Sequence, residues 1–142
     1  MESAAVGVIL DTSVVIAGER RGHSVPQILK QFKNECGETE MGLSVVTVVE
    51  LIHGVQRAAT GQQRHRRQAF VDEVIRVVPV HPVTVETARI AGRIEGERAS
   101  RGVTIAFEDL LIAATALQLG FGVATSNVRH FLQVPGLKVA EL

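Results

Sequence analysis

The sequence predicts an α/β fold in which helices cover both faces of a mostly parallel central sheet. Short apolar segments alternate along the chain with segments of helical periodicity, which is the pattern of strand–helix–strand units. Residues 4–10 form a continuous apolar segment that ends at Asp11, as expected for a strand buried on both faces. Residues 107–119 are nearly all apolar, which predicts a helix buried at the centre of the fold.

The remaining elements follow from local signals along the chain. A short helix is expected over residues 12–18, and Ser24 and Gln27 match a capping box that opens a helix reaching about Cys36. Further strands are expected at residues 41–46, 77–80, 122–125 and 137–139, and further helices from residue 47, over 62–76, and from Pro82 to about Arg101. This order favours a three-layer arrangement with the sheet in the middle.

Length and composition indicate one folded domain spanning residues 1–142. The chain is 46% hydrophobic, and its 15 basic residues offset 15 acidic ones, so overall charge neither favours nor excludes nucleic acid binding. Cys36 is the only cysteine, which excludes an intrachain disulfide and suits a reducing compartment. A signal peptide would carry positive charge near its start, where this chain has Glu2. The longest apolar stretch is too short to span a bilayer. We therefore expect a cytoplasmic protein with no membrane partner.

Three carboxylates stand at the expected starts of three helices. Asp11 is placed as an N-cap, Thr47 and Glu50 match a capping box, and Asp109 lies in a first turn, where the helix dipole favours negative charge. Each position alone thus has a purely structural explanation.

The three positions together favour a different interpretation. Asp11 and Glu50 both follow strands, and such positions gather at the carboxyl edge of an open parallel sheet, where ligands bind. Asp109 opens the apolar helix and is expected to be partly desolvated. Carboxylates about 5 Å apart repel by roughly 3 kcal/mol per pair at an effective dielectric near 20. A hard divalent cation such as Mg²⁺ or Mn²⁺ relieves this repulsion, so we expect all three acids to be metal ligands.

Five segments in one order carry a family resemblance. They are residues 10–13 (LDTS), 49–51 (VEL), 109–116 (DLLIAATA), 125–127 (TSN) with Phe131, and 134–137 (VPGL). Each segment is weak alone, but the set extends over nearly the whole chain. In these segments the sequence resembles the PIN-domain toxins of bacterial toxin–antitoxin pairs, the VapC group.

The resemblance implies a three-layer α/β/α PIN-like fold and Mg²⁺- or Mn²⁺-dependent endonucleolytic cleavage of RNA. It identifies Asp11, Glu50 and Asp109 with the family's first three acids, which hold the metal whose water attacks the phosphodiester. It further implies a homodimer, inhibited by a small cognate VapB-like antitoxin that inserts a segment into the active-site groove.

The chain departs from the family pattern at one position. PIN domains often carry a fourth acid near the 125–127 segment, where this sequence has Asn127 and His130. We expect the amide oxygen of Asn127 to join the catalytic group, as neutral oxygens do at such sites, and His130 either to contact phosphate or to have a structural role. The missing acid predicts one firmly held metal, with a second only when substrate is present.

Several neighbouring residues are candidates for substrate binding. The hydroxyls of Thr12 and Ser13 are placed to hold a water or a local backbone group, and Arg20 follows the first helix. Residues 64–67 (RHRR) are either a solvated helix face or a patch that attracts phosphate. The five phenylalanines are expected in the core rather than in a base-stacking platform: Phe32, Phe70, Phe107, Phe121 and Phe131.

Three other functional classes compete with a nuclease. An inert PIN scaffold acting as a protein-interaction module would keep the acids as caps. A phosphoacceptor receiver domain needs clustered acids and a late lysine, whereas the lysines are Lys30, Lys33 and Lys138. An aspartyl-phosphate phosphatase needs a second aspartate two positions after the first, where this chain has Ser13.

Overall fold

A computed structural model describes residues 6–142 and confirms the α/β class. The sheet has the strand order β3-β2-β1-β4-β5, and every neighbouring pair is parallel. Its strands are β1 (Gly7–Leu10), β2 (Glu40–Ser44), β3 (Val80–His81), β4 (Gly122–Thr125) and β5 (Val139–Glu141). The helices are α1 (Thr12–Arg20), α2 (Val25–Cys36), α3 (Val45–Gln56), α4 (Gly61–Val77), α5 (Val85–Ala99), α6 (Phe107–Leu119) and α7 (Val128–Phe131). Within residues 6–142, no helix is both long and apolar enough to cross a membrane.

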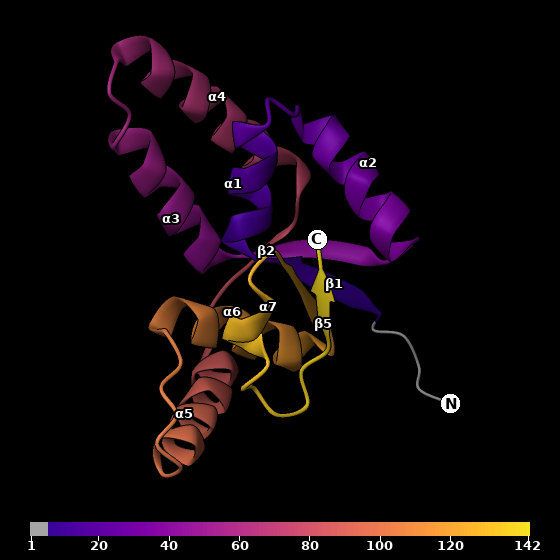
Figure 1. The fold of residues 1–142 in the computed structure, drawn as a ribbon, viewed down its shortest axis with the longest axis vertical. Coiled ribbons are helices and arrows are strands. Elements are labelled where there is room, and N and C mark those ends of the chain that lie inside the picture. The colour runs from indigo at the N-terminus through magenta and orange to yellow at the C-terminus, as the bar shows by residue number, and fades with distance from the viewer. Residues whose placement is uncertain (1–5) are drawn as a thin grey trace.

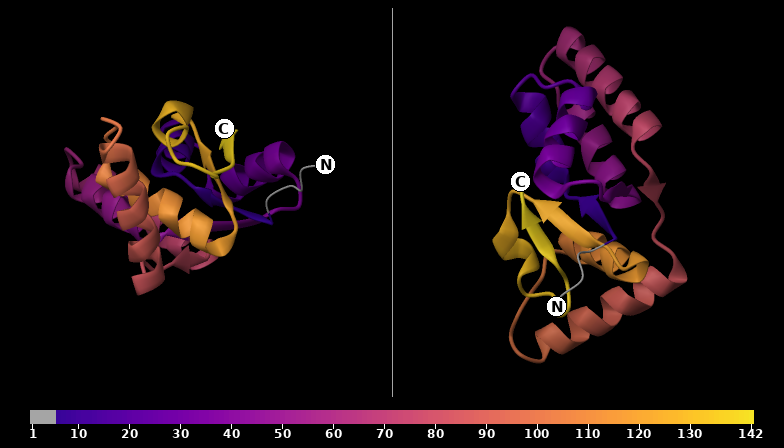
Figure 2. Two further views of the ribbon diagram at one scale, coloured as in Figure 1. Left: turned by 90° about the horizontal axis from the view of Figure 1, so that it is seen from below. Right: turned by 90° about the vertical axis from the view of Figure 1, so that its right-hand side faces the viewer.

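Helices cover the two faces of the sheet in two groups, α1–α4 on one face and α5–α7 on the other (Figures 1 and 2). Alternating side chains of β1 separate the two cores: Val8 and Leu10 pack with the first group, and Ile9 packs with the second. This is the expected three-layer arrangement, and it explains why β1 is apolar at every position.

Helix α6 is central, as expected, because Ile112, Ala113 and Ala114 are completely buried. Its first residue is different, since Phe107 is 63% exposed. The expectation that all five phenylalanines lie in the core is therefore wrong for Phe107. The buried and half-buried ones are Phe32, Phe70, Phe121 and Phe131.

Helix caps account for the shifted boundaries in the first half of the chain. Strand β2 ends at Ser44 because the Ser44 hydroxyl accepts from the backbone N–H of Val46 and opens α3 at Val45. Thr47 is therefore inside α3, and the expected capping box of Thr47 and Glu50 is wrong. The box of Ser24 and Gln27 is confirmed by both of its hydrogen bonds.

Three further boundaries differ by a few residues. Helix α4 continues to Val77, so the strand expected at residues 77–80 is the two-residue β3. The next helix, α5, begins at Val85 rather than at Pro82, because Thr84 is its N-cap and the Thr84 hydroxyl accepts from the N–H of Thr87. Strand β5 begins at Val139, two residues after the expected start. The first strand is described from Gly7, and residues 4 and 5 of the expected strand lie outside the described residues.

Candidate active site

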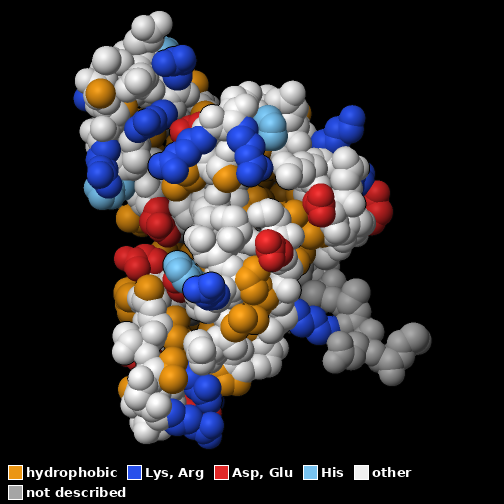
Figure 3. All heavy atoms as spheres, viewed as in Figure 1, with side chains coloured by type: hydrophobic (Ala, Val, Ile, Leu, Met, Phe, Trp, Pro, Cys, Tyr) orange, Lys and Arg blue, Asp and Glu red, His pale blue; other side chains and the backbone are white. Residues whose placement is uncertain are grey.

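The carboxyl edge of the sheet brings the predicted acids to one region of the molecule. Asp11 follows β1, Glu50 lies in the helix that follows β2, and Asp109 lies in the first turn of α6. Figure 3 shows acidic side chains gathered where α3 approaches α6, at the boundary between the two helical layers. The parallel topology thus produces the clustering that the sequence pattern predicts.

Asp11 is a buried carboxylate fixed by hydroxyl groups. Its side chain is 5% exposed, and its Oδ2 accepts hydrogen bonds of 2.8 Å from the Ser13 hydroxyl and 2.8 Å from the Thr125 hydroxyl. Its backbone N–H donates to the carbonyl of Ala124 at 2.8 Å. Asp11 occupies the N-cap position of α1, but its side chain makes no cap hydrogen bond. The N-cap explanation of this carboxylate is therefore wrong.

The same hydroxyls tie the loop after β4 to Asp11. Ser13 Oγ accepts from the N–H of Ser126 at 3.2 Å, and Thr125 Oγ1 accepts from the N–H of Asn127 at 2.8 Å. From the sequence, Thr125 is only one residue of the 125–127 segment, and its individual role is not predicted. The available signal was a hydroxyl residue ending an apolar strand beside the segment that carries Asn127.

Glu50 is held by a second hydroxyl pair. Thr12 Oγ1 lies 2.9 Å from Glu50 Oε1 and 3.0 Å from Thr47 Oγ1. The Thr12 hydroxyl has one proton, which it donates to Glu50 or shares between Glu50 and Thr47. Burial raises the pKa of Glu50, the hydrogen bond from Thr12 opposes this, and nearby negative charges raise the pKa further. Those charges are Asp11, Glu108 and Asp109.

Asp109 faces the same group of charges from the opposite layer. Burial is the main cause of its raised pKa, and the charge of Asp11 raises it further. His130 opposes the shift, because its Nδ1 lies 3.1 Å from Asp109 Oδ2. Glu108 is exposed, yet its charge adds to the raised pKa of both Glu50 and Asp109. The acids are therefore coupled across the boundary between the layers.

Residues 8–137 match the family model described as PIN domain. The chain belongs to the PIN domain family. It is 32% identical over 134 residues to Ribonuclease VapC1 of Rickettsia felis, with 94% of this chain and 95% of the relative covered. It is 29% identical over 133 residues to the tRNA(fMet)-specific endonuclease VapC of Shigella flexneri, with 94% and 96% covered.

Solved structures resemble this PIN domain over almost its whole length. The DNA-bound VapBC of Salmonella typhimurium matches with a TM-score of 0.81 and 26% identity, covering 96% of this chain and 98% of the other. FitAcB of Neisseria gonorrhoeae matches with a TM-score of 0.78 and 26% identity, covering 94% and 96%. The three-layer fold is thus the fold of these proteins.

The donor set of this PIN domain fits a hard divalent cation. Two partly desolvated carboxylates, Glu50 and Asp109, have raised pKa values, and the charge of Asp11 contributes to both shifts. A bound cation would remove the cost of keeping both ionised. Within residues 6–142, no three His, Cys, Asp or Glu side chains are already placed as a complete ligand set. Mg²⁺ commonly binds one or two carboxylates and completes its shell with water and substrate phosphate. The three-carboxylate ligand set therefore stays a prediction.

The other predicted residues of the PIN domain differ in how closely they join the acids. Thr12, Ser13 and His130 each contact one of the three carboxylates directly. The Asn127 side chain is exposed and makes no hydrogen bond within residues 6–142, so its catalytic role stays a prediction. Arg20 contacts none of the three acids, but it lines the same small hollow as Glu50.

Proposed function

We propose that this chain is a PIN-domain ribonuclease of the VapC kind, the toxin of a toxin–antitoxin pair, which hydrolyses RNA phosphodiester bonds. The observation that carries the proposal is the meeting of Asp11, Glu50 and Asp109 at the carboxyl edge of a PIN-domain sheet. Relatives named as ribonucleases or endonucleases align with more than nine-tenths of the chain, which supports the same activity here.

The acids and hydroxyls provide a site for Mg²⁺ or Mn²⁺, with Asp11, Glu50 and Asp109 as its ligands. When bound, the ion supplies Lewis acidity for the attack of water on the phosphodiester. Thr12 orients Glu50 through its hydroxyl, and Ser13 and Thr125 fix Asp11. His130 orients Asp109 and presents its exposed ring to the substrate side. Asn127 contributes an amide oxygen next to the acids.

A small VapB-like antitoxin is the proposed partner of this chain. One of the solved structures that match it is a VapBC complex of Salmonella typhimurium bound to DNA. This chain aligns with one chain of that complex over 96% of its length at 26% identity, and VapBC is the name of a family of toxin–antitoxin systems. A homodimer and a cytoplasmic location remain predictions from the sequence.

The test is cleavage of a panel of transfer, ribosomal and messenger RNAs by the purified protein, with mapping of the cut ends. We expect cleavage with Mg²⁺ or Mn²⁺ and none in EDTA. Glu50→Gln removes one proposed ligand and should abolish cleavage. Glu95→Gln makes the same change at an exposed position of α5 and should not. A folded wild-type protein that cuts no RNA with either ion would favour the inert interaction module instead.

A further inference from the structure

A cleft with a basic lining lies between the end of α1 and helix α4. Its volume is about 460 Å³, and three guanidinium groups face one carboxylate there. The lining residues are Glu19, Arg20, Gly22, His23, Gln63, Arg66, Arg67 and Phe70. Since the whole chain has no net charge, this concentration of positive charge belongs to one part of the surface. Figure 3 shows Lys and Arg side chains over that part, above the acidic edge.

The basic cleft leads directly to the acidic site. A neighbouring hollow of about 110 Å³ shares Glu19, Arg20 and Arg67 with it and is also lined by Glu50. Basic side chains therefore begin beside a proposed catalytic carboxylate and continue along α4 to Arg66. A polyanion that reaches the acids must be attracted by charges of this kind, because the carboxylates themselves repel phosphate.

The arginines of the cleft are partly fixed and partly without partners. Arg67 Nη1 donates to the carbonyl of Gly54 at 2.9 Å, and its Nε lies 4.0 Å from Glu19 Oε1. Arg66 makes no ion pair or side-chain hydrogen bond within residues 6–142. The buried Nδ1 of His23 likewise has no hydrogen-bond partner among the described residues. The cleft thus combines one oriented guanidinium, that of Arg67, with the exposed guanidinium of Arg66, which remains available to a ligand.

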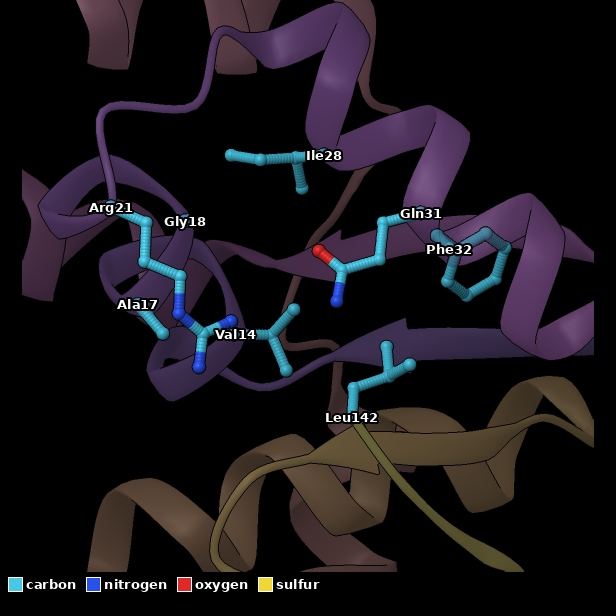
Figure 4. Close-up of a pocket in the computed structure, with 8 residues that line it drawn as sticks. All are labelled: Val14, Ala17, Gly18, Arg21, Ile28, Gln31, Phe32 and Leu142. Carbon is cyan, nitrogen blue, oxygen red and sulfur yellow. The ribbon is translucent and has the colours of Figure 1, made fainter.

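A second cavity on the same face of the sheet lacks these properties. It lies between α1, α2 and the C-terminal Leu142, with the side chains of Arg21 and Gln31 directed toward it (Figure 4). Its volume of about 20 Å³ is enough for about one water molecule. The cleft between α1 and α4, by contrast, has a volume of about 460 Å³ and shares lining residues with the hollow that Glu50 lines.

We propose that the cleft between α1 and α4 binds the ribose–phosphate backbone of the RNA on one side of the cut bond, with Arg20 and Arg66 contacting phosphates. This inference rests on the proposed nuclease function and extends it to the path of the substrate. Arg67, held by Gly54 and Glu19, positions the wall between the cleft and Glu50. The lining offers guanidinium groups and only one half-buried aromatic residue, Phe70, so binding here is largely independent of base sequence.

The test is binding of a fluorescein-labelled, mixed-sequence, single-stranded RNA in EDTA, followed by fluorescence anisotropy over a salt series. Arg20→Gln combined with Arg66→Gln should weaken binding about tenfold or more at low salt. It should also reduce the slope of log K against log salt by about 1.4, since each lost phosphate contact contributes about 0.7 on single strands. Arg64→Gln, on α4 but outside the cleft, and Arg93→Gln, on exposed α5, should change neither quantity.

The outcomes separate this inference from the function on which it rests. If the double variant keeps its wild-type melting temperature, affinity and salt slope, the RNA path is wrong even when cleavage with metal is intact. An unchanged RNA affinity would then favour an acidic protein segment as the occupant of the cleft. If the wild-type protein binds RNA with the expected salt slope but cuts none, the nuclease proposal fails while the binding path stands. No binding by the wild-type protein at low salt overturns the path directly.

Discussion

The two sides of the acidic site hold their carboxylates in opposite ways. Asp11 is almost fully buried, and two hydroxyl donors at 2.8 Å satisfy its Oδ2. Glu50 and Asp109 are partly exposed, each has one side-chain partner, and burial and neighbouring charges raise the pKa of both. One side is therefore a satisfied buried anchor, and the other carries negative charge that the protein alone does not neutralise.

This difference separates the proposed ligand that the fold also needs, Asp11, from the two that the fold does not need, Glu50 and Asp109. Hydrogen bonds to a buried charge stabilise the folded chain, so Asp11 joins β1, α1 and β4 at the sheet edge. Uncompensated charge is tolerated where a ligand will supply the opposite sign, and Glu50 and Asp109 face that position. The comparison therefore predicts that the two sides respond differently to the same kind of substitution.

The largest effect is expected from Asp109→Asn on RNA cleavage. The change preserves shape and one acceptor oxygen for His130 but removes a charge that the proposed metal requires. We expect the cleavage rate with Mg²⁺ or Mn²⁺ to fall by about 10³-fold or more, comparable to losing a major electrostatic contribution. Asp72→Asn, at an exposed position of α4, is the matched control and should cut at the wild-type rate. If the two variants cleave RNA at comparable rates, Asp109 is not part of the catalytic site.

The next effect is on stability and concerns the anchor. Asp11→Ala removes the acceptor of the Ser13 and Thr125 hydroxyls inside a buried region. Leaving such groups unpaired typically costs about 1–3 kcal/mol each, so we expect a loss of about 2–4 kcal/mol in the free energy of unfolding, measured by urea titration. The matched control is Asp72→Ala, which should change stability by less than about 0.5 kcal/mol. A similarly small loss at Asp11 would contradict its role as the anchor.

Metal should stabilise the protein through the opposite side of the site. An ion that binds only the folded protein adds about 2.7 kcal/mol at a concentration 100 times its Kd. We therefore expect Mg²⁺ or Mn²⁺ to raise the melting temperature, and Ca²⁺ serves as a second oxygen-binding cation for comparison. In Asp109→Asn the increase should shrink. If millimolar metal does not change the melting temperature of the wild-type protein, the proposed metal site is wrong.

The sequence predicted the layers and the placement of the acids at one edge of the sheet because both follow from periodicity and parallel topology, whereas their sharing of one metal ion stays a prediction. Apolar strands followed directly by polar residues specify an edge, and Asp11, Glu50 and Asp109 were found from this pattern. Helix boundaries were less predictable, since a serine or threonine at several nearby positions can serve as the cap. Ser44 rather than Thr47 caps α3, and that choice depends on where β2 stops pairing with its neighbours.

Contacts between distant side chains were beyond the reach of sequence reasoning. The hydrogen bond from Thr125 to Asp11 joins residues 114 positions apart, and no local pattern specifies its geometry. The exposure of Phe107 was missed because composition alone places phenylalanine in the core, whereas this one precedes the buried turns of α6. The basic cleft was missed as a unit because Arg20 and Arg66 come from elements that pack together only in the fold.

The smallest effect sharpens the comparison most, because its sign differs between the two explanations of Asp109. The pKa of Asp109 is raised from 3.8, so the folded state binds this proton more tightly than the unfolded state. Stability from this group is therefore intact at acidic pH and declines as the pH rises through the folded pKa. Asp109→Asn resembles the protonated acid at every pH. In EDTA, its stability should match the wild-type value near pH 3 and exceed it slightly near pH 7, as measured by melting temperature.

A purely structural first-turn carboxylate predicts the reverse. The ionised group would then stabilise the N-terminal end of α6, and the asparagine variant would melt below the wild-type protein at neutral pH. Glu108→Gln is the matched comparison, because Glu108 lies in the same turn but is exposed. Its dipole contribution should resemble that of Asp109, whereas its desolvation is smaller. If the metal-free Asp109→Asn variant melts below the wild-type protein at pH 7 by as much as Glu108→Gln does, both acids act only as first-turn charges, and the distinction between the anchor and the charged side is wrong.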